Sequence, residues 1–225
     1  MSSCNTWAIV PVKSLTLVKQ RLKAVLPLAA RRQLMLTMLE DVLATLRQVE
    51  HLPVLVVTPD PLVVELAETA GALTLREAVS SGHSAAAVAG FVHAQVHGAV
   101  RAFTVPADAP LVTANEVREL IEAGRQTTGP NVTLVPNHDG DGTNCFLVSP
   151  PDLMQPSFGS GSFARHLAAA AALQVECRVL QLPGLALDID ESADLAKLMN
   201  HKQSDPKYAF LQKRNVDAAL QMVSR

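Results

Sequence analysis

Three aspartates have the residue type and the spacing of a site that holds a hard cation. Asp108 follows the apolar run of residues 100–105, and open α/β sheets place ligand sites just beyond the carboxyl ends of such strands. Asp188 and Asp190 are two residues apart in a segment that the pattern predicts to be extended, so both side chains project to one face. Converging carboxylates with few nitrogen ligands suit Mg2+, which substrate phosphates would complete. The alternative is that each aspartate caps a turn or a helix.

A cationic loop follows the first apolar run, Ala8-Ile9-Val10-Pro11-Val12, which predicts a buried strand. The loop carries Lys13, Lys19 and Arg21 before a helical pattern resumes. A strand that ends in such a loop and feeds a helix is a common phosphate site in α/β sheets. Three cations that only solvate a surface loop would leave the same pattern. The aspartates favour the phosphate site, because they supply the metal that a triphosphate requires, and Lys13 is the strongest single candidate.

Two Gly- and Ser-rich turns indicate a second anion pocket. Phe158-Gly159-Ser160-Gly161-Ser162 precedes a helical pattern, so its backbone N–H groups and the positive end of the helix can point at one ligand. Ser162 either caps that helix or binds the anion. Asp141-Gly142-Thr143-Asn144 offers a hydroxyl and an amide before a strand, although a plain β-turn is the more common explanation of such a segment.

The elements that must position these residues alternate in type along the chain. We expect strands at residues 8–12, 54–57, 72–75, 100–105, 132–135, 145–148, 177–182 and 185–189. Helices are expected at residues 28–49, 62–70, 84–97, 163–173 and 191–199, with a further helix capped by Thr113 and Glu116. The alternation predicts a single-domain, Rossmann-like α/β fold, in which helices flank a mostly parallel sheet with an inserted hairpin. Residues 1–199 would form this domain, and residues 200–225 a helical extension that docks on its own domain or on a second subunit.

The composition restricts the class of protein. The formal charge of -2 argues against a general binder of nucleic acid or of membrane surfaces. Cys4, Cys145 and Cys177 are scattered and odd in number, which favours reduced thiols in a cytoplasmic protein. We expect neither a signal peptide nor a membrane span. The sequence motifs of P-loop proteins, dinucleotide-binding proteins and triad hydrolases are missing.

Five stretches resemble, in the same order, the 2-phospho-L-lactate guanylyltransferase family of coenzyme F-420 biosynthesis, which belongs to the GT-A-like nucleotidyltransferases. They are Ile9-Val10-Pro11-Val12-Lys13 with Lys19-Gln20-Arg21-Leu22, Pro106-Ala107-Asp108-Ala109-Pro110-Leu111, Asp141-Gly142-Thr143-Asn144, Phe158-Gly159-Ser160-Gly161-Ser162-Phe163-Ala164-Arg165-His166 and Gly184-Leu185-Ala186-Leu187-Asp188-Ile189-Asp190. The resemblance covers the chain from about Trp7 to Met199 and leaves the tail outside it.

The resemblance implies a Mg2+-dependent enzyme that transfers GMP from GTP to the phosphate of a small three-carbon acid and releases pyrophosphate. The acid would be 2-phospholactate, phosphoenolpyruvate or 3-phosphoglycerate. The partners would be small molecules, not nucleic acid or membranes, and relatives suggest a homodimer. The implied nucleotide-binding residues are Pro11, Val12, Lys13, Lys19, Arg21, Gly82, Ser84 and Asp108. The implied acceptor-binding residues are Thr143, Asn144, Gly161 and Ser162, the metal ligands Asp108, Asp188 and Asp190, and the catalytic residues Lys13, Lys19 and Asp108.

Two departures from the family pattern matter. Gly82-His83-Ser84 stands where the family usually has Gly-Leu-Asn near the base, which leaves guanine recognition open. The alternatives are a related nucleotidyltransferase with another nucleotide or acceptor, and a non-catalytic nucleotide-binding module. Ala109 stands where a leucine is common, a change that we expect to affect packing only.

Overall fold

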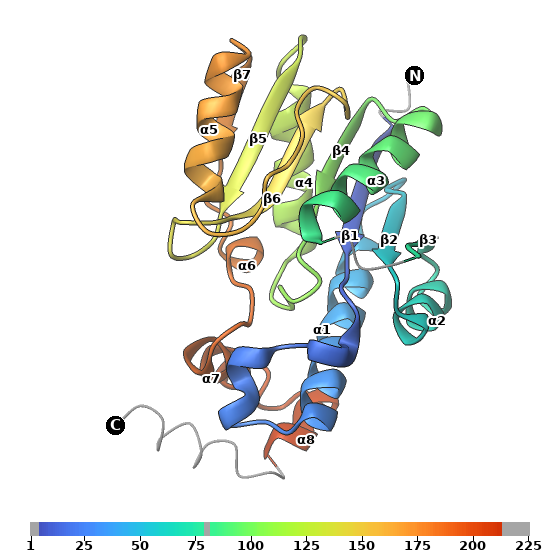
Figure 1. Ribbon diagram of the computed structural model, residues 1–225, viewed down its shortest axis with the longest axis vertical. Helices are drawn as coiled ribbons and strands as arrows, with labels where there is room; N and C mark the ends of the chain where they lie inside the picture. Colours follow the sequence, from blue (N-terminus) through green and yellow to red (C-terminus); the bar gives the residue numbers. More distant parts are fainter. Residues whose placement is uncertain (1–4, 79–81, 213–225) are drawn as a thin grey trace.

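The computed structural model describes residues 5–78 and 82–212, and a seven-stranded sheet lies at its centre (Figure 1). The strands are β1 (Thr6–Pro11), β2 (Val54–Thr58), β3 (Leu73–Arg76), β4 (Arg101–Thr104), β5 (Asn131–Pro136), β6 (Thr143–Ser149) and β7 (Glu176–Val179). Their order is β3-β2-β1-β4-β6-β5-β7, and of these seven strands only β6 pairs antiparallel with both of its neighbours. The sheet confirms the predicted, mostly parallel α/β fold.

Helices cover both faces of the sheet. The longer helices are α1 (Leu28–Leu46), α2 (Pro61–Thr69), α3 (His83–Val96), α4 (Ala114–Arg125), α5 (Ser162–Ala172) and α7 (Ser192–His201). The short ones are η1 (Leu15–Leu17), η2 (Gln20–Ala24), α6 (Pro183–Ala186), η3 (Pro206–Tyr208) and α8 (Ala209–Gln212). α3 and α5 lie on one face, and α1, α2 and α4 lie on the other (Figure 1). Each predicted helix of residues 28–199 is present, and Thr113 and Glu116 form the predicted capping box at the start of α4.

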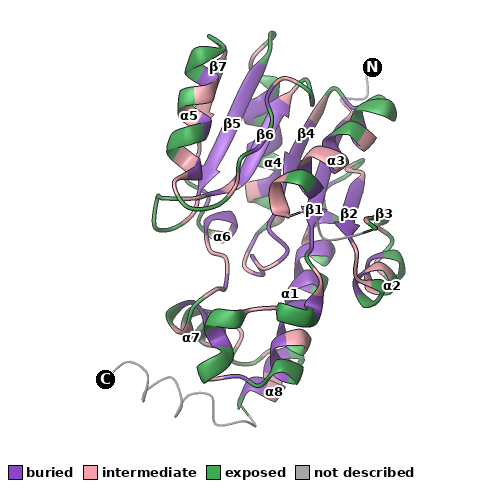
Figure 2. Ribbon diagram, in the orientation of Figure 1, coloured by how far each residue is buried: buried purple, intermediate pink, exposed green. Residues whose placement is uncertain are grey.

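The central strand β1 shows why the sheet carries two hydrophobic cores. Successive side chains of a strand point to opposite faces. Trp7 and Ile9 therefore join the cluster under α3 and α5, whereas Ala8 and Val10 join the larger cluster under α1. All six residues of β1 are buried (Figure 2). The strand that leads into the cationic loop is thus fixed from both sides.

The reversed strand β6 brings its first residues to the ligand-binding edge of the sheet. It pairs with β5 as the predicted hairpin, with Asn131 opposite Ser149 at one end and Pro136 opposite Thr143 at the other. Because β6 runs against β4, its amino end lies at the same edge as the carboxyl ends of β1 and β4. That edge is where α/β sheets bind their ligands.

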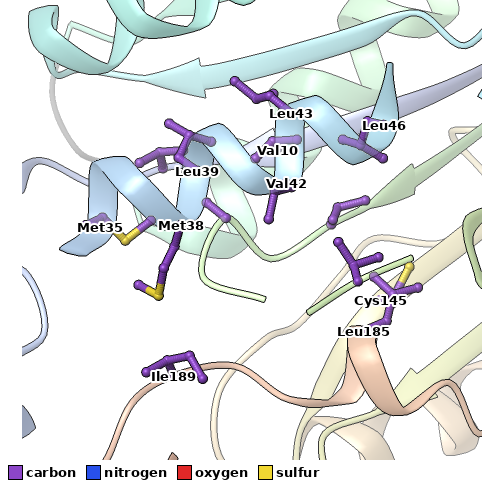
Figure 3. Packing of buried hydrophobic residues seen from close by; sticks show 14 of the residues in the cluster. Val10, Met35, Met38, Leu39, Val42, Leu43, Leu46, Cys145, Leu185 and Ile189 are labelled. Carbon is purple, nitrogen blue, oxygen red and sulfur yellow. The ribbon is translucent and has the colours of Figure 1, made fainter. Parts of the chain in front are cut away.

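The prediction of a strand at residues 185–189 is wrong. Residues 183–186 form the short helix α6, and residues 187–190 have no partner strand among the described residues. Pro183 at the first helical position and a hydrogen bond from Gly184 N–H to Glu116 Oε1 (2.6 Å) favour the turn. The apolar residues that suggested a strand, Leu185 and Ile189, are instead buried in the larger cluster beside α1 (Figure 3).

The described part of the C-terminal segment packs on α1. Tyr208 is buried in the larger cluster. Asp41 of α1 accepts hydrogen bonds from Lys202 Nζ at 2.7 Å, from Lys207 Nζ at 2.9 Å and from the Tyr208 hydroxyl at 3.0 Å. Of the two docking modes left open by the sequence, the segment up to residue 212 takes the one on its own chain. The predicted final helix, around Val216 to Val223, lies outside the described residues.

Helix α7 continues to His201, so no change of structure marks the expected boundary between residues 199 and 200. The division into a domain and an extension stays a prediction. Within the two described ranges, no helix combines the length and the apolar composition needed to cross a membrane.

Candidate functional site

The loops at the carboxyl edge of the sheet bring the three predicted aspartates together. Asp108 lies in the turn after β4. The backbone N–H of Ile189 donates to the Asp108 carbonyl oxygen at 3.0 Å, which fixes the extended segment of residues 187–190 beside this turn. Asp188 and Asp190 flank Ile189 in the sequence, so the bond brings both carboxylates close to Asp108. The spacing argument therefore gave the right neighbours although it assumed a strand that does not form.

Lys19 is the cation within this group. Its backbone adopts a left-handed conformation (φ 49°) between η1 and η2. Its ammonium donates to Asp108 Oδ2 and, at 2.8 Å, to Asp190 Oδ1, and only 4% of its side chain is exposed. Burial alone would lower the pKa of Lys19, but the two carboxylates outweigh burial and raise that pKa above its ordinary value. Lys19 is thus a fixed positive charge between two carboxylates.

The pKa values of Asp108 and Asp188 are shifted in opposite directions. Burial would raise the pKa of Asp108, but the Lys19 ammonium holds it below its ordinary value. Burial and then the charges of Asp108 and Asp190 raise the pKa of Asp188, and hydrogen bonds from Asn144 and from the backbone N–H of Asp188 itself offset this only in part. Asp188 has no cationic partner among the described residues, so a second positive charge beside it would relieve the repulsion. Carboxylate oxygens in this number are a donor set that fits Mg2+.

No three His, Cys, Asp or Glu side chains of residues 5–78 and 82–212 are gathered round one point as a ready coordination shell. The Lys19 ammonium lies between the carboxylates of Asp108 and Asp190, in the place that a metal ion bound by both would take.

Two side chains of α1 and the residue that caps α2 hold the cationic loop in place. Buried Arg31 of α1 donates from Nη1 to the carbonyl oxygen of Lys19 at 3.3 Å and to that of the preceding residue at 2.7 Å. Arg32 Nε donates to the Leu15 carbonyl at 3.1 Å, and Asp60 Oδ2 accepts the Leu15 N–H at 2.8 Å. The sequence analysis missed these residues. Arg31 carried a signal, since a charged residue among the apolar positions of a helix needs buried partners.

The other cations of the first loop are exposed. Lys13 lies two residues beyond the end of β1 and forms no ion pair with a described residue. Arg21 is 70% exposed and pairs with Glu191 at 3.1 Å. Pro11 and Val12 are buried and contribute backbone only. The structure therefore brings Lys19 to the aspartates and leaves Lys13 exposed without an ion pair to a described residue, whereas Arg21 would have to leave Glu191 to approach a ligand.

The start of α3, where the family pattern departs, contacts the loop before α5. Gly82 is the N-cap and has a positive φ of 96°. The Phe158 N–H donates to Ser84 Oγ at 2.9 Å, and the His83 ring packs edge-on against Phe158 with 4.6 Å between centroids. Burial lowers the pKa of His83 to about 4, which the Asp108 carboxylate offsets only in part. A neutral imidazole therefore lies near the aspartates.

Thr143 and Ser162 lie together at the starts of β6 and α5. The Thr143 N–H donates to Ser162 Oγ at 2.9 Å, and both side chains are buried. His166, one turn further along α5, contacts Thr143 Oγ1 through its Nδ1 at 2.9 Å. The sequence analysis gave His166 no role, because a lone histidine in a helix carries no signal of its contacts.

Asn144 and Gly161 use their donors inside the protein. Asn144 Nδ2 donates to the carbonyl oxygens of Leu185 (3.1 Å) and Ala186 (2.9 Å) and to Asp188 Oδ1 (3.0 Å). The Gly161 N–H donates to Asp141 Oδ2 at 3.0 Å. Their predicted contacts with an acceptor stay predictions, and the geometry gives Asn144 the further task of holding Asp188.

Comparison with known proteins identifies the family. The sequence pattern of the CofC-like guanylyl transferases matches residues 6–225 of the chain. The chain belongs to this family. It is 41% identical over 194 residues to a phosphoenolpyruvate guanylyltransferase of Rubrobacter xylanophilus, across 86% of this chain and 93% of that protein. It is 40% identical over 200 residues to the enzyme of the same name from Sphaerobacter thermophilus, across 88% of this chain and 94% of that protein. The resemblance noted from five stretches is confirmed.

The family match corrects one expectation about this CofC-like chain. It extends to residue 225, so the tail is part of the family's sequence pattern and does not lie outside it. A solved nucleotidyl transferase from Methanothermobacter thermautotroptrophicus has a TM-score of 0.62 at 18% identity, across 87% of this chain and 96% of that one. At that identity the likeness establishes the fold alone.

Proposed function

We propose that this CofC-like protein transfers GMP from GTP to the phosphate of phosphoenolpyruvate in coenzyme F-420 biosynthesis. An oxygen of the acceptor phosphate forms a bond to the α-phosphorus of GTP, and the bond from that phosphorus to the leaving pyrophosphate breaks. One observation carries the proposal: in a guanylyl transferase, Lys19 pairs with Asp108 and Asp190, and Asn144, the residue after Thr143, donates to Asp188, which links the aspartates to the segment of the Thr143–Ser162 pair. The choice of phosphoenolpyruvate rests on the names of the relatives at 41% and 40% identity.

Asp108, Asp188 and Asp190 would hold Mg2+. A bound divalent cation offsets the negative charge that gathers where two anions react. The raised pKa of Asp188 supports this assignment, since burial and then the neighbouring carboxylates disfavour the charged form of Asp188 and Lys19 forms no ion pair with it. With the ion held by the carboxylates, Lys19 has its ammonium free for a phosphate oxygen of GTP.

The first loop would receive the triphosphate. Exposed Lys13 and Arg21 would reach the phosphates by side chain. Pro11 has no N–H and the Val12 N–H already donates to the Val57 carbonyl oxygen at 2.9 Å, so these two residues would only shape the loop. No protein nucleophile is needed, because positioning and charge neutralisation supply the catalysis of nucleotidyl transfer.

The acceptor acid would bind at Thr143 and Ser162. Both hydroxyl oxygens accept hydrogen bonds from the protein, so each hydroxyl retains a hydrogen for an anionic oxygen. Asn144 would act on Asp188, since both of its amide hydrogens already have carbonyl or carboxylate partners. The Gly161 N–H reaches the acceptor only if it leaves Asp141.

Transfer from another nucleotide is the second candidate. It is favoured by the contacts of Gly82-His83-Ser84, where the Ser84 oxygen already accepts the Phe158 N–H and His83 is neutral. Gly82 and Ser84 remain our candidates for contacts with the base. A cytoplasmic location and a homodimer also stay predictions, and light scattering on the purified protein tests the dimer.

The test is a matrix of nucleotides and acceptors. The purified protein is incubated with Mg2+, one of GTP, ATP, CTP or UTP, and one of phosphoenolpyruvate, 2-phospholactate or 3-phosphoglycerate. We expect pyrophosphate release and a guanylylated product, identified by mass, with GTP and phosphoenolpyruvate. Turnover with another nucleotide would move the assignment to the second candidate. No pyrophosphate release in any combination would overturn both candidate functions.

A further inference from the structure

A continuous chain of hydrogen bonds runs from the loop before α5 to Thr143. The Ser157 N–H donates to His166 Nε2 at 2.8 Å. His166 Nδ1 contacts Thr143 Oγ1 at 2.9 Å, and the Thr143 N–H in turn donates to Ser162 Oγ at 2.9 Å. His166 is 1% exposed. The ring is therefore shielded from solvent in this chain of hydrogen bonds.

The backbone fixes the tautomer of His166. A peptide N–H can only donate, so Nε2, which faces the Ser157 N–H, must carry a lone pair. A neutral imidazole with a bare Nε2 has its hydrogen on Nδ1. His166 therefore donates to Thr143 Oγ1, and the Thr143 oxygen accepts. The hydroxyl hydrogen of Thr143 is left to point away from the ring.

The side chains around His166 keep its imidazole ring neutral and fix its orientation. Phe146 and Phe158 pack against it with centroid distances of 4.8 Å and 5.7 Å. Burial and then the charge of Arg165 lower the pKa of His166 to about 4. The Arg165 guanidinium itself donates to the Ser157 carbonyl at 2.9 Å, which holds the loop that presents the Ser157 N–H.

We infer that His166 is a positioning residue: it makes the Thr143 hydroxyl a fixed donor to an anionic oxygen of the phosphorylated three-carbon acid. The inference rests on the proposed function, in which Thr143 binds that acid. Ser162 gains the same property from the Thr143 N–H, so the two hydroxyls present two hydrogens side by side. A pair of oriented donors selects an anion and disfavours a neutral or cationic acceptor.

The first experiment measures steady-state kinetics with phosphoenolpyruvate and GTP. His166→Ala should raise KM for the acceptor about tenfold or more, the loss expected for one hydrogen bond to a charged group, and leave KM for GTP within about twofold. Thr143→Val should do the same. The double variant should lose no more than either single variant, because His166 acts through Thr143.

Two replacements and one control separate positioning from packing. His166→Asn keeps an amide donor near the place of Nδ1 and should recover much of the acceptor affinity. His166→Gln reaches toward Ser157 instead and should recover less. Leu167→Ala removes a partly buried neighbour on the same helix that packs in the second cluster, and it should lower the melting temperature without changing KM for the acceptor.

The second experiment reads the tautomer directly. Long-range 1H–15N NMR of the free, 15N-histidine-labelled protein should show His166 with a protonated Nδ1 and a bare Nε2. A protonated Nε2, an unchanged acceptor KM in His166→Ala, or additive losses in the double variant would each overturn the inference. An inactive wild type would count against the proposed function, whereas the tautomer would still test the arrangement of His166.

Discussion

The contact between α1 and the C-terminal segment allows a sharp prediction about stability. Asp41→Asn removes the negative charge that Lys202 and Lys207 share and leaves one acceptor oxygen for the Tyr208 hydroxyl. Hydrogen bonds to charged groups contribute roughly 1.5–3 kcal/mol when buried and well under 1 kcal/mol when exposed. The Lys202 and Lys207 side chains are 22% and 45% exposed, so both bonds are partly screened.

From these contacts we expect Asp41→Asn to lower the free energy of unfolding by about 2 kcal/mol at pH 7. For a chain of this length that corresponds to a fall in Tm of about 4–8 °C. Tyr208→Phe, which loses only the neutral hydroxyl, should cost about 1 kcal/mol. Guanidinium unfolding, followed by circular dichroism, measures both variants against the wild type.

The pH dependence tests the cause. Burial would raise the pKa of Asp41, but the hydrogen bonds from Lys202 and Lys207 hold it below its ordinary value. A carboxyl whose pKa is lower in the folded state stabilises that state above its unfolded pKa of about 4, and the contribution disappears as the pH falls through the lowered value. The difference between wild type and Asp41→Asn should therefore shrink below about pH 4. An equal difference at pH 7 and pH 3 would refute the assignment to charge.

Three further predictions concern the site and its support. Asp190→Asn should lower kcat about a hundredfold or more without loss of fold, and chelation of divalent cations should abolish activity that added Mg2+ restores; full activity after chelation would contradict the metal assignment. Arg31→Met should raise KM for GTP, because the carbonyl oxygens of Lys19 and of the preceding residue lose their hydrogen-bond donor. An unchanged KM would show that this loop does not bind the nucleotide. Gly90→Ala should destabilise the fold by about 1–3 kcal/mol, since a Cβ would lie within 3.0 Å of Ile9 Cγ2, while Gly129→Ala, with no neighbour within 4 Å, should cost little.

Periodicity predicted the sheet and its flanking helices well, because strands with alternating or continuous apolar residues have few other ways to bury them. It failed at residues 185–189, where the apolar residues are as buried as in a strand but face α1 across a turn. An apolar run can form a strand only where a neighbouring strand of the sheet has an unpaired edge for hydrogen bonding. A pattern along one chain contains no information about that edge.

The sequence predicted which residues would lie near one another at the candidate site better than it predicted their contacts, and their roles stay predictions. Lys19 does meet Asp108 and Asp190, and Asp188 lies close enough for the charge of Asp108 to raise its pKa, although only Asp108 follows a strand of the sheet. That Lys19 reaches the carboxylates while Lys13 stays exposed depends on a left-handed turn at a lysine, a conformation that its residue type disfavours. The roles of Asn144 and His166 depend on which acceptor receives each of their N–H groups. These hydrogen bonds can be assigned only from the three-dimensional structure.

The position of Lys19 would also couple the binding of the two proposed ligands, Mg2+ and GTP. The protein carries its own competitor for the cation, since an ammonium already occupies the space between Asp108 and Asp190. A triphosphate that draws this ammonium away exposes the carboxylates to the metal, and a metal that displaces it frees the ammonium for the triphosphate. By linkage the two ligands then favour each other's binding to the same extent. If Mg2+ and GTP bind as proposed, either ligand alone would have to break ion pairs that the other would already have broken, and the two would bind best as a pair.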